Sequence, residues 1–123
     1  VPVVIVDFRI DPLVNTPKSM RILGKLMDRE KEAEAFLAFY EAELKRVPDK
    51  VNSIKNRPTV FMESRVGLMP RCCEAIGQAM MGRFIDWAGG VNAYADKIPG
   101  THGMVDREYL LINQFLLHKI YKI

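Results

Sequence analysis

Two short segments with the character of strands, separated by a long stretch with helical periodicity, limit most strongly how this chain can fold. Residues 1–6 read Val-Pro-Val-Val-Ile-Val, and residues 59–64 read Thr-Val-Phe-Met-Glu-Ser, with an apolar centre. Such runs predict buried strands. The expected order is strand, helices, strand, helix, loop, helix. That order favours an α/β architecture with parallel strand pairing.

The stretch between these runs carries two helix patterns. A Thr-Pro pair predicts a helix over residues 17–27, and an acidic first turn predicts a longer helix over residues 28–47. Apolar residues three and four apart draw one stripe along the longer helix: Ala33, Phe36, Leu37, Tyr40, Leu44 and Val47. The stripe predicts a helix that packs on a partner surface. Pro48 is expected to interrupt it.

The second half predicts one more strand-loop-helix succession. Residues 65–70 are irregular and follow a strand, which is where α/β proteins place ligands. Residues 71–88 carry a helical pattern, and Gly89-Gly90 supply its C-terminal stop rather than a phosphate loop. A loop over residues 91–103 and a helix over residues 107–114 complete the expected elements.

Composition narrows the classes of function. The 123 residues fit one core, and 18 basic against 15 acidic side chains leave a net charge of +3 that is scattered along the chain. We therefore expect no nucleic-acid partner. No stretch reaches the ~20 apolar residues of a membrane span, and residues 1–6 lack the features of a signal peptide. Because the chain opens inside a strand, we expect it to be part of a longer polypeptide.

The residues that could carry chemistry form no catalytic pattern. His102 and His118 lack metal-ligand spacing, and the serines lack a Gly-x-Ser-x-Gly elbow. Cys72 and Cys73 are adjacent, and because a bridge between neighbours is strained, we expect two reduced thiols at a helix start. The chain is therefore expected not to be an enzyme.

Four sequence blocks in order resemble one protein family. Residues 57–74 and 80–92, ending in Ala88-Gly89-Gly90-Val91-Asn92, resemble the second lobe of a class III substrate-binding protein of a bacterial ABC importer. Upstream, residues 19–36 resemble the approach to the long interlobe helix of that family. Downstream, residues 103–111 resemble the segment in which a glutamate opens the next helix.

The resemblance implies an architecture and a division of the chain. The expected fold is the parallel-sheet, α/β lobe of a two-lobed protein with a long bridging helix. Residues 1–15 would be the last strand of the first lobe and a loop. Residues 16–56 would be a helical segment that includes the bridging helix, and residues 57–123 would be a partial second lobe.

The resemblance also implies a function. Proteins of this family bind an iron chelate (a ferric siderophore or haem) or cobalamin without chemical change and deliver it to a membrane permease. No intrinsic cofactor is expected. Such a chain would act in the periplasm or anchored on the cell exterior, and the signal sequence is absent from this stretch. Uncovered apolar faces would favour a homo-oligomer of the truncated chain.

A ligand half-site follows from these expectations. Arg65 and Arg71 would meet the negative oxygens of the chelate, Leu68 and Met69 would offer adaptable apolar surface, and His102 could reach the same rim. Two alternatives remain. The chain could be a fragment of a flavodoxin-like or Rossmann-like enzyme, or a scaffold domain without ligand. The tail, residues 115–123, departs from the family and receives no role.

Overall fold

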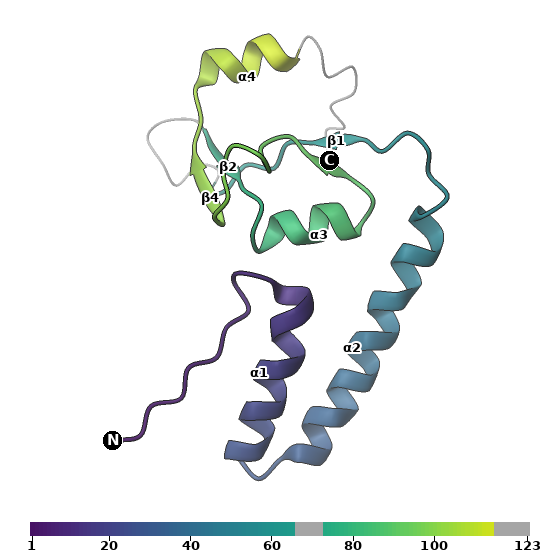
Figure 1. The fold of residues 1–123 in the computed structure, drawn as a ribbon, viewed down its shortest axis with the longest axis vertical. Helices are drawn as coiled ribbons and strands as arrows, with labels where there is room; N and C mark the ends of the chain where they lie inside the picture. The colour runs from purple at the N-terminus through teal and green to yellow at the C-terminus, as the bar shows by residue number, and fades with distance from the viewer. Residues whose placement is uncertain (66–72, 115–123) are drawn as a thin grey trace.

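The computed structural model describes residues 1–65 and 73–114 (Figure 1). Two helices come first, α1 (Pro12–Leu26) and α2 (Glu30–Val51), and together they form what we call the helical hairpin. The other elements form what we call the α/β part: β1 (Thr59–Val60), β2 (Glu74–Ile76), α3 (Met81–Trp87), β3 (Val91–Asn92), β4 (His102–Met104) and α4 (Arg107–Gln114). Figure 1 shows α3 between the hairpin and the strands.

Four short strands form two pairs in the described residues. β1 and β3 run parallel, and Thr59 lies opposite Val91. β2 and β4 run antiparallel, and Glu74 lies opposite Met104. The predicted α/β class with parallel pairing is therefore confirmed. The antiparallel pair was not expected, since it contradicts the prediction of one helix over residues 71–88.

That predicted helix is wrong in its first half. β2 occupies Glu74–Ile76, and α3 begins only at Met81. Met80 has a φ of 52°, a left-handed conformation that interrupts any regular helix. A short apolar run does not distinguish strand from helix by periodicity alone, and here complete burial and backbone pairing favour the strand. The predicted glycine stop is confirmed, because Gly89 follows α3 with a φ of 84°.

The cysteines also differ from expectation. Cys73 is disulfide-bonded, whereas the sequence predicts two reduced thiols. It lies immediately before β2 and not at a helix start. Cys72, the only other cysteine of the sequence, lies outside the described residues.

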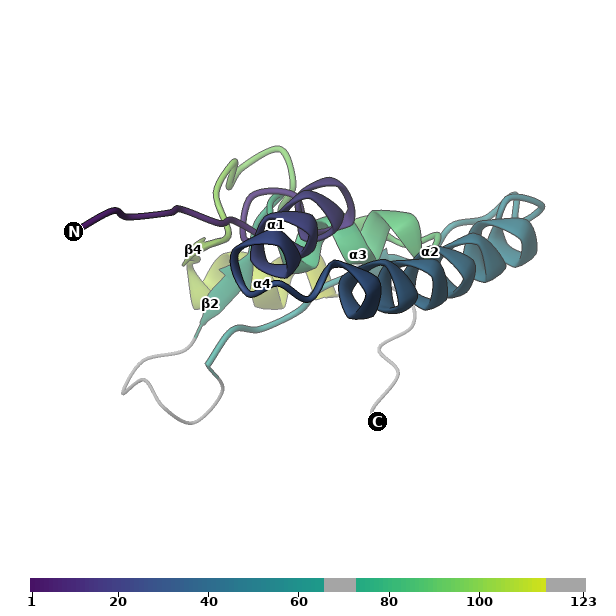
Figure 2. The ribbon, with the colours of Figure 1, turned by 90° about the horizontal axis from the view of Figure 1, so that it is seen from below.

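The N-terminal residues do not form the predicted buried strand. Residues 1–6 have no regular secondary structure, and the side chains of Val3 and Ile5 are largely exposed. The segment projects away from the rest of the molecule in both views (Figures 1 and 2). Its β-branched residues favour an extended backbone, but a strand also needs a neighbouring edge. No described strand pairs with it.

Both helices of the hairpin differ from their predicted bounds, α1 by an earlier start and α2 by a later end. α1 starts at Pro12 rather than residue 17, because the Asp11 carboxylate caps it by accepting hydrogen bonds from the Leu13 and Val14 amides at 3.2 and 3.3 Å. α2 continues through Pro48, which does not end the helix. The Asn52 amide still donates to the Pro48 carbonyl at 2.9 Å, which keeps the last turn closed.

Part of the predicted stripe on α2 faces its partner helix, but Phe36 does not follow the prediction, since it is 42% exposed. Ala33 and Leu37 are buried, and the Tyr40 hydroxyl donates to the Pro12 carbonyl at 3.2 Å. Gly24 on α1 allows close contact, because a Cβ at this position would lie 2.6 Å from the Ala33 Cβ. Figure 2 shows the two helices side by side. None of the described helices has the length and apolar character needed to span a bilayer.

A polar junction ties the hairpin to the α/β part. Arg83 of α3 reaches the carboxylate of Asp11, with both its Nε and one terminal nitrogen 3.0 Å from Oδ2. The Met80 amide donates to the Ile10 carbonyl at 3.2 Å. The residue that caps α1 is therefore also the residue that anchors α3.

The core of the α/β part lies against one face of β2. Its buried members come from three elements or their flanks, and partly buried side chains surround them: Cys73, Ala75, Tyr94, Leu110, Phe61, Ala93, Ile98 and Val105. Side chains alternate along a strand. Ala75 therefore points to this core, whereas Glu74 lies on the opposite face of β2.

Candidate ligand-binding site

A buried carboxylate organises the most polar cluster of the α/β part. Glu74 is only 5% exposed, and a charge this buried requires partners. Arg65 supplies two of them: its Nε donates to Glu74 Oε2 at 2.7 Å, and its Nη2 donates to Oε1. The Nε2 atom of His102 lies 3.5 Å from the same Oε1. We call these three residues the Glu74 cluster.

Backbone pairing places Arg65 beside Glu74. The segment before Arg65 runs antiparallel to β2, since the Ser64 amide donates to the Glu74 carbonyl at 2.6 Å and the Ile76 amide donates to the Met62 carbonyl at 2.9 Å. Arg65 itself has a φ of 54°. Non-glycine residues rarely adopt this left-handed conformation, which often marks functional positions.

His102 reaches the cluster from the other side of β2. It opens β4, where it lies opposite Ile76. The preceding residue is fixed twice, because the Thr101 carbonyl accepts from the Gly77 amide at 3.0 Å and the Thr101 hydroxyl lies 2.9 Å from His102 Nδ1. The antiparallel pair thus brings together residues that are far apart in the sequence.

The charges of the cluster compensate each other. The hydrogen bonds from Arg65 lower the pKa of Glu74, against the opposing effect of desolvation. The same interaction raises the pKa of the Arg65 guanidinium. The pair is therefore ionised at neutral pH and has no net charge.

Part of the cluster still faces solvent. The Arg65 side chain is 48% exposed and that of His102 is 33% exposed. Within the described residues, Arg65 Nη1 makes no hydrogen bond. The cluster can therefore donate hydrogen bonds to a ligand oxygen while Glu74 stays buried.

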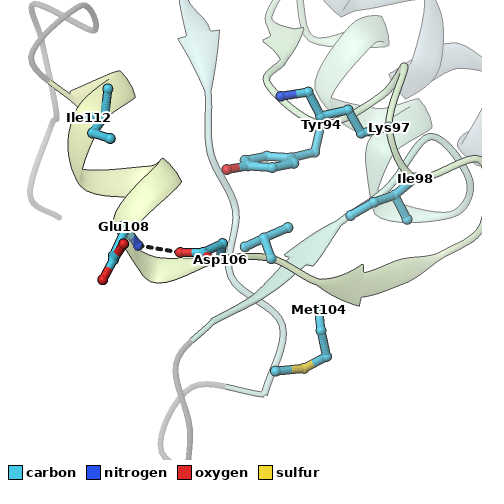
Figure 3. Close-up of a pocket in the computed structure, with 8 residues that line it drawn as sticks. Tyr94, Lys97, Ile98, Met104, Asp106, Glu108 and Ile112 are labelled. Carbon is cyan, nitrogen blue, oxygen red and sulfur yellow. Dashed lines mark hydrogen bonds between the residues drawn. The ribbon is translucent and has the colours of Figure 1, made fainter.

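A pocket of about 560 Å³ lies elsewhere in the α/β part (Figure 3). It is mainly apolar, and its lining comes from the turn after β3, from β4 and from α4: Tyr94, Lys97, Ile98, Met104, Val105, Asp106, Glu108 and Ile112. Met104 and His102 are alternate residues of β4 and so share one face of that strand. Tyr94, Ile98 and Val105 of the lining belong to the core on the Ala75 face, so much of this apolar surface lies across the strands from the Glu74 cluster.

Comparisons with known proteins identify the fold. No protein-family model and no curated relative matches the sequence. Among solved structures, the chain is similar to the TroA-like periplasmic binding protein FepB from Veillonella parvula, with 23% identity over 88% of this chain and 31% of that chain and a TM-score of 0.69. The chain has the TroA-like substrate-binding fold.

Two further structures share the TroA-like fold with it. An ABC transporter substrate-binding protein from Listeria monocytogenes is 24% identical over 87% of this chain and 39% of that chain, with a TM-score of 0.70. The periplasmic haem-binding protein RhuT from a Roseiflexus species, in apo form, is 23% identical over 80% of this chain and 37% of that chain, with a TM-score of 0.66. The chain therefore spans about a third of the length of the structures it matches.

The Ala-Gly-Gly-Val-Asn block is structural in this TroA-like fold. The buried Asn92 side chain donates to the Gly77 and Ile76 carbonyls at 2.8 and 3.3 Å and accepts from the Tyr94 amide at 3.0 Å. It thereby ties β3 to the end of β2. Since the Gly77 amide in turn holds Thr101, Asn92 supports the position of His102.

The structure describes only part of the predicted half-site. Arg65 and His102 come together, and their terminal nitrogens Nη2 and Nε2 lie 3.5 Å apart. Leu68, Met69 and Arg71 lie outside the described residues. A role for any of the five in ligand binding stays a prediction. In residues 1–65 and 73–114, no group of three or more His, Cys, Asp or Glu side chains is arranged to hold a metal ion.

Sequence reasoning missed Glu74, the centre of the cluster. A helix over residues 71–88 gives its side chain a different direction, so no partnership with Arg65 follows. A signal was present: Cys73-Glu74-Ala75-Ile76 is a short run that ends at Gly77. Such a run also fits a buried strand. A strand there would have pointed Glu74 away from the apolar face that carries Ala75.

Proposed function

We propose that the chain is part of the substrate-binding component of an ABC importer. It binds an iron chelate, either a ferric siderophore or haem, and delivers it to a membrane permease. The protein acts in the periplasm or anchored on the cell exterior. It performs no chemistry on its ligand.

The fold and its structural neighbours support this proposal. One neighbour is an ABC transporter substrate-binding protein, and another is a periplasmic haem-binding protein. Both are binding proteins, which favours a non-enzymatic role. The chain spans about a third of their length, so we propose that it supplies one side of the binding site.

One observation carries the ligand class: the donors of Arg65 and His102 and a mainly apolar pocket at β4 belong to the same α/β part. Iron chelates present oxygen acceptors on a large, partly apolar body, and this arrangement matches both features. A scaffold without ligand would not need Arg65 in a left-handed conformation with about half of its side chain exposed. An enzyme fragment would instead show turnover of an ester, phosphate or nicotinamide substrate.

Calorimetric titration of the full chain tests the proposal. The probes are a ferric trihydroxamate, a ferric tris-catecholate and haemin, each titrated into the chain and into Arg65→Ala. We expect saturable binding of at least one probe. In Arg65→Ala its affinity should fall by about ten- to a hundredfold, the equivalent of one lost charged hydrogen bond of roughly 1.5–3 kcal/mol.

Arg46→Ala is the matched control. Arg46 also pairs with a glutamate, Glu43, but it lies on α2 and its side chain is more exposed than that of Arg65. This variant should bind the probes as the unmodified chain does. The absence of saturable binding for all three probes would contradict the proposed function.

We also propose that the isolated chain self-associates. Several large apolar side chains of the hairpin are exposed, among them Leu26, Met27 and Phe39. Exposed apolar surface of this kind favours association. Light scattering at tens of micromolar, a range in which such surfaces associate, should give a mass above that of a monomer. A monomer mass would contradict the proposed self-association.

A further inference from the structure

We propose that Glu74 determines the charge of the preferred ligand, so that the site selects an uncharged ferric chelate over a polyanionic one. This inference rests on the proposed function and narrows its substrate class. A positively charged rim would favour trianionic catecholates. The Glu74 cluster instead offers hydrogen-bond donors without net positive charge.

The geometry of the pair supports this selection. Arg65 uses both Nε and Nη2 on the two oxygens of Glu74, which is a bidentate arrangement. Glu74 is almost fully buried, whereas nearly half of the Arg65 side chain is exposed. A ligand therefore meets the guanidinium, while the carboxylate behind it cancels the long-range field of that guanidinium.

The arginine cannot readily leave this pair to meet an anion. If Arg65 turned toward a polyanionic ligand, Glu74 would remain as a buried carboxylate without its bidentate partner, with only Ser64 and His102 beside it among the described residues. Removal of one member of a buried pair is strongly unfavourable, because it leaves an uncompensated charge. The structure therefore favours ligands that accept a hydrogen bond from Nη1 with the pair intact.

An uncharged ferric trihydroxamate fits this requirement. Its oxygens accept hydrogen bonds, and it has no charge that needs compensation. A neutral Arg65–Glu74 pair adds little to the binding affinity of a trianionic ferric tris-catecholate. An Arg65 without its carboxylate partner would raise that affinity. A single added positive charge beside the bound ligand should change the affinity for a trianion by on the order of tenfold or more.

Glu74→Gln tests the inference, because it removes the negative charge and nearly preserves the side-chain shape. Calorimetry with the ferric trihydroxamate and the ferric tris-catecholate should show a catecholate affinity about tenfold higher than in the unmodified chain. The trihydroxamate affinity should stay within about twofold, since an uncharged ligand does not respond to the added charge. The measured quantity is the ratio of the two affinities.

Two further variants keep the result interpretable. Glu43→Gln makes the same change of charge in an Arg-Glu pair on α2, away from the cluster, and should leave the ratio unchanged. Arg65→Gln/Glu74→Gln removes both charges, so its ratio should return toward that of the unmodified chain. Circular dichroism of each variant checks that the helices remain.

The outcomes separate the two proposals. If the chain binds chelates and Glu74→Gln changes the ratio no more than Glu43→Gln does, the selection by Glu74 is wrong and the proposed function stands. If neither chelate binds to the unmodified chain or to any variant, the inference fails, and the iron-chelate function is wrong as well when haemin also does not bind.

Discussion

The helical hairpin and the α/β part are held together in different ways. In the hairpin, the backbone hydrogen bonds are local to each helix, and the ion pairs, such as Arg21 with Glu34, are exposed on both sides. In the α/β part, loops distant in sequence bond to one another, and the central ion pair has one almost fully buried member.

This difference indicates how each part responds to change. Two helices that touch through side chains can shift apart by a small amount. The loop after β2 has less freedom, because the Gln78 and Ala79 amides donate to the Ile98 and Gly100 carbonyls at 2.8 and 3.1 Å. A substitution in that loop should therefore displace the residues of the Glu74 cluster, whereas a substitution in the hairpin should not.

Gly82→Ala should give the largest effect. A Cβ at Gly82 would overlap the carbonyl oxygen of Gly77, and backbone on both sides cannot move aside easily. We expect the free energy of unfolding to fall by about 3 kcal/mol or more, above the usual cost of overpacking. Urea unfolding followed by circular dichroism measures it. Gly100→Ala is the control, since nothing lies within 4 Å of its added Cβ; equal losses in the two variants would contradict the steric explanation.

Gly24→Ala should cost less, although it also introduces a close contact. The added Cβ would lie 2.6 Å from the Ala33 Cβ, which is a side-chain atom on the neighbouring helix. Alanine regains about 1 kcal/mol of helix propensity, so we expect a net loss of about 1–2 kcal/mol. The same urea experiment measures it, and binding of the chelate probes should be unchanged. A loss as large as that of Gly82→Ala would contradict the view that the hairpin can relax.

The same contrast explains how much could be predicted from sequence. The two helices of the hairpin follow from local signals, and Ala33 and Leu37 of the predicted stripe are buried, whereas Phe36 is exposed. Their bounds differ because a cap at Asp11 and tolerance of Pro48 near the end of α2 are not visible in periodicity. Local patterns therefore predicted the hairpin well.

The α/β part was harder to predict because its strands depend on distant partners. β2 is three residues long and is stabilised by pairing with residues 62–64 and with β4. No local pattern shows that pairing, so the sequence predicts a helix there. The same pairing positions Glu74 against Arg65. The centre of the candidate site was missed for that reason, although Arg65 and His102 themselves were predicted.

Acidic pH should weaken the α/β part through Glu74. Its pKa is lowered from an ordinary value of 4.5 by the hydrogen bonds from Arg65, so the pair stabilises the fold above that value. The contribution is lost as the pH falls below about 4.5 and through the lowered pKa. In Arg65→Gln the pKa should rise. Urea unfolding at several pH values should therefore show a stability difference between the two proteins that shrinks toward about pH 3. A constant difference would contradict the role of this pair.

The smallest effect should come from Arg46→Ala on α2. Arg46 and Glu43 lie 2.6 Å apart, but their side chains are 64% and 46% exposed, so water screens the pair. We expect a change in unfolding free energy of about 0.5 kcal/mol or less, because exposed pairs contribute little and alanine favours a helix. Arg83→Ala is the comparison, since Asp11 at the junction is only 23% exposed and also caps α1. That variant should lose about 1–2 kcal/mol. Urea midpoints measured side by side show which variant loses more stability. A larger loss for Arg46→Ala than for Arg83→Ala would contradict the expectation that exposed pairs of the hairpin contribute less.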